Sequence, residues 1–129
     1  MSEQQATGSF EVKMTPESKP GAAIGRMSLD KQFRGGLDAA STGEMLSYRA
    51  AVAGSAGYVA MEQVVGALDG RHGSFVLQHS GTMDRGVPAL ALTVVPDSGT
   101  EALEGLSGSM TIDMSDGQHH YTMRYSLPG

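Results

Sequence analysis

The sequence predicts an all-β fold, and more specifically a closed, eight-stranded antiparallel barrel with up-and-down (meander) topology. Segments in which apolar and polar residues alternate recur about every dozen residues, glycine turns separate them, and no stretch sustains a helical period over about ten residues. The length of 129 residues fits a single domain. Closing the meander removes the exposed strand edges, so a barrel is favoured over the alternative, an open sandwich.

The strands follow from this alternation. Residues 1–6 are expected to form a flexible N-terminal tail before a first strand at residues 10–14. Two prolines within residues 15–21 forbid a ladder and indicate a loop. Further strands are expected over residues 25–33, 37–49, 58–69, 73–83, 88–95, 103–115 and 118–127.

The connections are short and rich in glycine. Turns are predicted at residues 35–36, 69–72, 84–86 and 116–117, and a loop of small residues at 50–57. Pro96 ends the sixth strand, and Ser98 and Glu101 have the spacing of a capping box, so one helical turn is expected there.

Composition excludes several classes of function. The chain has no cysteine, which rules out disulfides, thiolate metal sites and cysteine nucleophiles. A formal net charge of −5 with nine scattered Lys and Arg gives no basic stripe, so nucleic acid is not an expected partner. No apolar run is long enough to cross a membrane, and the polar start lacks a signal-peptide pattern, so we expect a cytoplasmic protein.

The C-terminal hairpin has the clearest predicted register. If Asp116-Gly117 forms a two-residue loop, Ser115 pairs with Gln118 and each further pair is fixed. A nearly all-apolar face, and hence the interior, then contains the opposed pairs Met114 and His119, Ile112 and Tyr121, Met110 and Met123, Gly108 and Tyr125, and Leu106 and Leu127.

The central hairpin gives a second register. With Gly70-Arg71 as its loop, the opposed pairs are Leu68 and Gly73, Gly66 and Phe75, Val64 and Leu77, and Glu62 and His79. The other face is more polar but also carries Val59, Met61 and Val65, so placing Glu62 and His79 inside is a preference. A two-residue loop shifted by one residue leaves both on one face, whereas a three-residue loop separates them.

Glu62 and His79 define the candidate site. Glu62 lies past mid-strand, toward the barrel end that carries the 116–117 turn, where His119 also lies. The predicted ligand-binding residues are Tyr58, Glu62, His79, Met83, Met114 and His119.

The role of the pair is open. A carboxylate and an imidazole opposed in an apolar interior can move protons, which makes Glu62 and His79 the candidate catalytic residues. They can equally satisfy one another structurally or line a ligand cavity.

Metal and cofactor sites have little support. His119 and His120 point to opposite faces of a strand, so one metal ion cannot take both, and we expect no metal. Ser98-Gly99-Thr100 lacks the following lysine of a phosphate loop, and no cofactor is expected. Lys31 shares the register of Met27, Leu29 and Phe33, so its amine points inward unless a bulge at residues 35–36 or a snorkelling stem turns it outward.

Several segments resemble the bacterial family called domain of unknown function 3224. They are residues 58–62, 70–79, 94–100 and 103–108, and the resemblance spans about residues 8–127. It implies an allene-oxide-cyclase-like barrel, similar in kind to a lipocalin, with eight antiparallel strands around a cavity. It implies no cyclase activity, because fold does not carry function and the cyclase's catalytic residues have no matching positions here.

Three functions remain open. The first is binding of a small apolar molecule in a Met-rich cavity, with Glu62, His79 and His119 orienting its polar end. The second is an isomerase, cyclase or lyase with Glu62 or His79 as general acid or base. The third is a packed barrel that forms homo-oligomers through an outer apolar patch, to which Val59, Met61 and Val65 would contribute.

Overall fold

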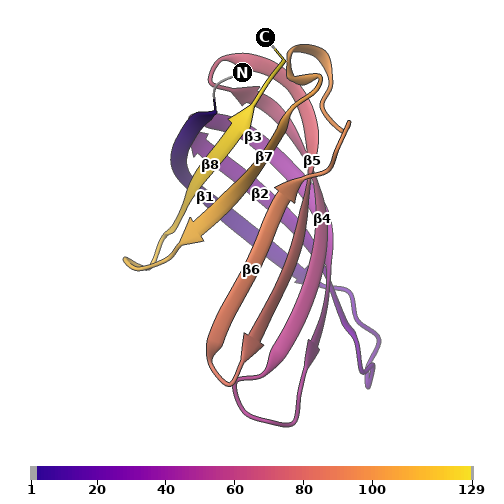
Figure 1. Cartoon of the computed structure of the whole chain (residues 1–129). Coiled ribbons are helices and arrows are strands. Elements are labelled where there is room, and N and C mark those ends of the chain that lie inside the picture. Colours follow the sequence, from indigo (N-terminus) through magenta and orange to yellow (C-terminus); the bar gives the residue numbers. More distant parts are fainter. Residues whose placement is uncertain (1–2, 129) are drawn as a thin grey trace.

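The structure, a computed structural model that describes residues 3–128, is a closed barrel of eight antiparallel strands in the order β1 to β8 (Figure 1), which confirms the predicted fold. The strands are β1 (Gln4–Pro16), β2 (Gly25–Gly35), β3 (Leu37–Arg49), β4 (Ala56–Leu68), β5 (Arg71–Asp84), β6 (Val87–Val94), β7 (Ser107–Asp113) and β8 (His119–Ser126). A short 3₁₀ helix, η1 (Glu101–Leu103), precedes β7. Within the described residues, no helix is long and apolar enough to span a membrane.

The first strand is longer than the alternation predicts. β1 begins at Gln4, which pairs with Tyr125 of β8, and Ala6 is buried. The flexible tail expected over residues 1–6 is therefore wrong for residues 4–6, while residues 1 and 2 lie outside the described part of the chain. Ala6 and Gly8 occupy inward positions of β1, and such small residues give little periodic signal.

The segment before β7 is a plug and not a strand. The helical turn expected near residue 101 is present, but Ser98 does not cap it: the Ser98 hydroxyl accepts the Val76 N–H and donates to the Val95 carbonyl. Leu103 and Leu106, predicted to lie on a strand, are instead buried apolar residues of the plug. The loop therefore fills the barrel end nearest the β4–β5 turn, which we call the upper end.

The register of the C-terminal hairpin is confirmed within the ladder. Ile112 lies opposite Tyr121, Met110 opposite Met123 and Gly108 opposite Tyr125. The two-residue loop is wrong, because the ladder ends at Asp113 and the Gly117 N–H donates to the Met114 carbonyl. Met114 consequently belongs to the turn.

The register of the central hairpin differs from the prediction by two residues. The loop is Asp69-Gly70, so Leu68 lies opposite Arg71 and Ala60, not Glu62, lies opposite His79. Both loop residues have positive φ, 48° for Asp69 and 84° for Gly70, as the tight turn of a twisted hairpin requires. Because the shift is even, inward residues remain inward, and Glu62 and His79 share the inner face.

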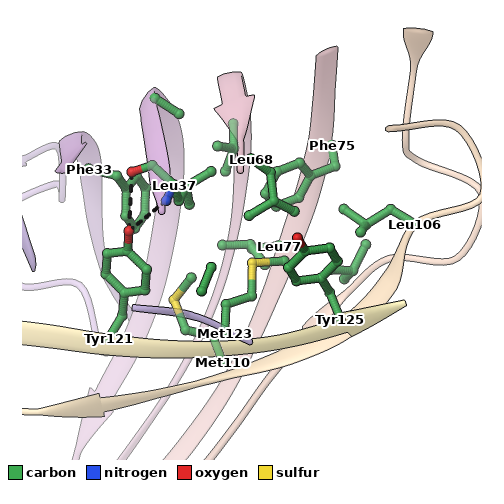
Figure 2. Close-up of a cluster of buried hydrophobic side chains, with 14 of the residues drawn as sticks. Phe33, Leu37, Leu68, Phe75, Leu77, Leu106, Met110, Tyr121, Met123 and Tyr125 are labelled. Carbon is green, nitrogen blue, oxygen red and sulfur yellow. Dashed lines mark hydrogen bonds between the residues drawn. The ribbon is translucent and has the colours of Figure 1, made fainter. Parts of the chain in front are cut away.

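Buried apolar side chains from β8 and from the strands that face it pack together as the core (Figure 2). Tyr121 and Tyr125 of β8 extend toward β3, β4 and β5. The Tyr121 hydroxyl accepts the Leu37 N–H at 2.8 Å and donates to the Arg34 carbonyl at 2.9 Å, while the Tyr125 hydroxyl donates to the Asp69 carboxylate. Both polar ends are thereby satisfied in the packed interior.

The lower half of the barrel is open on one side. The β7–β8 hairpin ends above the level of the β5–β6 turn at residues 85–86 (Figure 1). β6 pairs with β7 at one position, Thr93 opposite Ser109, and the β1–β8 ladder ends at Phe10 opposite His119. Below these positions β1 to β6 continue as a curved wall whose inner face is reached from the side.

Candidate functional site

A buried polar network lies on the inner face, between the packed upper core and the open lower half. Its centre is the Glu62 carboxylate, which is 1% exposed. Oε1 of Glu62 lies 2.9 Å from Nζ of Lys31 and 2.5 Å from Nε2 of His79, and Oε2 lies 2.5 Å from Oγ of Ser41. Lys31, Ser41 and His79 are themselves buried. Four consecutive strands, β2 to β5, therefore supply one network.

Lys31 and Glu62 meet although β3 runs between their strands. Directly opposite Glu62 on β3 is Gly43. A Cβ atom built on Gly43 would lie 2.7 Å from Cα and from Cβ of Glu62, and closer still to the Met61 carbonyl oxygen. The missing side chain of Gly43 leaves the space through which the Glu62 carboxylate extends toward Lys31 and Ser41.

Glu62 is ionised in this network. Burial alone would raise the pKa of its carboxyl, but the hydrogen bond from His79, the charge of Lys31 and the hydrogen bond from Ser41 outweigh burial and lower the pKa to about 2. A carboxylate accepts hydrogen bonds and donates none, so Nε2 of His79 carries the proton that lies between the two groups. A base with a pKa of about 2 accepts a proton poorly near neutral pH, which favours an orienting role over general-base catalysis.

The ammonium of Lys31 has a second set of neighbours. Nζ lies 4.8 Å from the ring centroid of Phe10 and 5.8 Å from that of Phe33. Cations are attracted to aromatic faces at such distances, most strongly where water is excluded. Of the two orientations that the sequence allows for Lys31, the structure shows the inward one. Ser41 was not predicted as a site residue, because apolar and polar residues alternate too weakly over residues 37–49 for the inward positions to be assigned.

Below the network, the inner face of the open half is lined by methionine. We call this surface the Met trough; it is formed by Met14, Met27, Met45, Tyr58, Met83 and Leu90. Met14, Met83 and Leu90 are 50%, 40% and 44% exposed, and the other three are half-buried. Three inward positions among them are small, Gly43, Ala60 and Gly81, and Leu29, opposite Met14, is buried. The trough is therefore apolar and accessible.

Tyr58 lies at the border between the network and the trough. Its ring centroid is 6.3 Å from that of His79, and its ring covers Gly81 on the neighbouring strand. Burial and then the negative charge of Glu62 raise the pKa of the Tyr58 hydroxyl, so the hydroxyl keeps its proton and remains a hydrogen-bond donor.

The structure brings together part of the predicted site. Glu62 and His79 are in direct contact, Tyr58 is beside them, and Met83 is in the trough. His119 is half-buried and stacks on Phe10 with 4.7 Å between ring centroids, so it approaches the network through Phe10. The placement of Met114 facing His119 in the interior is wrong, because Met114 is 52% exposed in the β7–β8 turn.

A surface hollow opens where β1 leaves β8. Its volume is about 410 Å³, and its lining residues are Ser9, Phe10, Glu11, Val12, Gly117, Gln118 and His119. The hollow does not reach Glu62 or His79, and the Phe10 ring lies between it and the Lys31 ammonium.

Among the described residues, no group of three or more His, Cys, Asp or Glu side chains has the arrangement of a metal site.

Comparisons with other proteins agree with this architecture. The family described as "Protein of unknown function (DUF3224)" matches residues 6–125 of the chain. The crystal structure of a protein of unknown function from the DUF3224 family of Shewanella oneidensis MR-1 is similar over 99% of both chains, with 51% sequence identity and a TM-score of 0.94. No curated protein matches the chain.

Proposed function

The chain belongs to the DUF3224 family, and because this membership assigns no activity, we propose from the geometry that the protein binds a small, largely apolar molecule in the Met trough. The observation that carries the proposal is the position of the Lys31–Glu62–His79 network at the head of an accessible, methionine-lined inner face of the barrel. Ligand sites typically combine an apolar wall with a few fixed polar groups.

The chemistry of the trough supports this function. Methionine is flexible and polarisable, so it adapts to ligands of irregular shape. The small inward residues at positions 43 and 81 leave room for the Glu62 side chain and the Tyr58 ring, which lie against them at the head of the trough. Tyr58 and His79 lie at the boundary between apolar and polar surface, where they can orient a polar end group.

The network supports binding more than catalysis. The Glu62 carboxylate already accepts hydrogen bonds from three side chains and has a pKa of about 2, so it is held as a fixed charge. Rigid, fully hydrogen-bonded groups position a ligand without reorganising on binding.

The absence of cysteine is compatible with the reducing cytoplasm, where we place this activity.

A fluorescence titration with Nile red, an uncharged apolar dye, tests the proposal. Met83→Glu puts a charge into the trough, and Met61→Glu puts the same charge on the outer face, where Met61 is 51% exposed. We expect Met83→Glu to weaken dye binding by about tenfold or more and Met61→Glu to change it by less than about twofold. Equal effects of the two variants, or no dye binding by the wild type, would contradict the proposal.

One observation favours self-association as a second candidate. The outward face of β3 and β4 carries a group of exposed apolar residues, namely Leu46, Tyr48, Val59, Met61 and Val65. Apolar patches of this kind often mark interfaces. Light scattering of the wild type and Met61→Glu tests it: a dimer or larger assembly that dissociates in the variant supports self-association, and a monomeric wild type contradicts it.

A further inference from the structure

The two buried ionised side chains on the inner face, Lys31 and Glu62, form an ion pair. Lys31 and Glu62 lie 2.9 Å apart, and the trough residues below them are methionine, tyrosine and leucine. Resting on the proposed function, we infer that the ligand of the Met trough carries no net charge and that its polar end is an uncharged oxygen group, such as a carbonyl, ester or hydroxyl.

The charges of the buried network balance. The positive charge of Lys31 and the negative charge of Glu62 cancel within one ion pair, and both side chains are almost fully buried. His79 donates to the same carboxylate through Nε2 and needs no positive charge to do so. The network at the head of the trough therefore presents no net charge to a ligand.

A charged ligand would be attracted by one member of the pair and repelled by the other. A carboxylate placed at the head of the trough would be attracted by Lys31 and repelled by Glu62, and an ammonium would meet the reverse. Neither charge would gain an unshared counter-ion from this pair to replace the water that it loses, and desolvation of an unpaired charge is strongly unfavourable. The net charge of −5 on the whole chain further disfavours anions.

Tyr58 provides the hydrogen-bond donor at the border of the trough. The Lys31 ammonium is engaged with one carboxylate oxygen and otherwise lies near the Phe10 and Phe33 rings, and its side chain is only 6% exposed. Tyr58 is half-buried, and the raised pKa of its hydroxyl keeps it a donor. A hydroxyl donor matches a carbonyl, ether or hydroxyl oxygen, which is uncharged and compatible with an otherwise apolar molecule.

Competition experiments on the full chain test the inference. Nile red is the reporter, and the competitors share one alkyl chain: decanol, methyl decanoate, decanoate and decylamine. The titrations are made below the micellar concentrations and at about pH 8, above the range in which free imidazole titrates. We expect the two uncharged competitors to displace the dye at concentrations at least about tenfold lower than decanoate or decylamine.

The outcomes separate the two proposals. If decanoate or decylamine displaces the dye as well as decanol does, the uncharged-ligand inference is overturned while trough binding stands. If the dye does not bind, or if Met83→Glu fails to weaken its binding, the proposed function fails and the inference fails with it.

Unbalancing the pair provides an independent readout. Glu62→Gln leaves Lys31 without its counter-ion, so decanoate should gain at least about tenfold relative to decanol, and Lys31→Met should give decylamine the corresponding gain. The double variant removes both charges and should restore the wild-type preference, which controls for effects of substitution other than charge. An unchanged preference in either single variant that folds would overturn the inference, and if neither folds, the wild-type competition series decides it.

Discussion

Lys31 and Glu62 form an ion pair of 2.9 Å across an intervening strand, with a glycine, Gly43, opposite Glu62 on that strand. The pair is buried, and Ser41 and His79 satisfy the remaining capacity of the carboxylate. Removing one partner of such a pair leaves an uncompensated charge in the interior, whereas removing both does not.

Glu62→Gln and Lys31→Met should each lower the free energy of unfolding by about 3–5 kcal/mol, because each leaves one buried charge unpaired. The double variant should recover a substantial part of that loss. Urea denaturation measures all three. Glu44→Gln is the matched control, since it breaks the exposed ion pair of Glu44 with Arg26 and should change stability by less than about 1 kcal/mol. A double variant less stable than both single variants would argue against the pairing.

The pH dependence of stability follows from the lowered pKa of Glu62. The pKa is about 2 in the folded chain against an ordinary value of 4.5, so the folded state binds a proton less readily than the unfolded state does. Glu62 therefore contributes its full share of stability above about pH 4.5, and this share of about 3 kcal/mol is lost as the pH falls toward 2.

Comparing the wild type with Glu62→Gln isolates this contribution, because the other carboxylates titrate equally in both proteins. The difference in unfolding free energy between them should be constant near neutral pH and shrink between about pH 4.5 and 2. A difference that does not change with pH would show that Glu62 is not held ionised by its partners.

Gly43→Ala should destabilise the barrel by about 1–3 kcal/mol, because the added methyl group would overlap the Glu62 backbone and side chain. Gly57→Ala is the matched control on β4. A Cβ atom there would have its nearest neighbour, the Gly81 carbonyl oxygen, at 3.8 Å, which is an ordinary contact. Thermal unfolding of both variants checks the expectation, and equal melting temperatures would contradict the role assigned to Gly43.

The barrel and much of its register could be predicted from sequence, because strand alternation and glycine turns are local signals. The C-terminal register followed from Asp116-Gly117, and the ladder above that turn agrees with it. In the central hairpin the choice between Gly70-Arg71 and Asp69-Gly70 was not decidable locally. Asp69 takes the positive φ, and its carboxylate accepts a hydrogen bond from Tyr125, a residue 56 positions away in the sequence.

The candidate site was predictable in part for the same reason. Glu62 and His79 share a face in either two-residue loop, so their proximity survived the wrong choice of loop. Lys31 and Ser41 reach Glu62 only because β2, β3 and β4 are neighbours and Gly43 leaves a space between them, which no local pattern records. Met114 was misplaced because the ladder ends one residue before it.

Methyl NMR of methionine-labelled protein tests the central claim, ligand binding in the Met trough, most directly. Addition of decanol should shift the methyl resonances of Met14, Met27, Met45 and Met83 and leave those of the exposed Met61 and Met114 in place. Core methionines Met110 and Met123 provide a check that the fold is unchanged. Shifts confined to Met61 or Met114, or shifts of equal size at every methionine, would contradict the account.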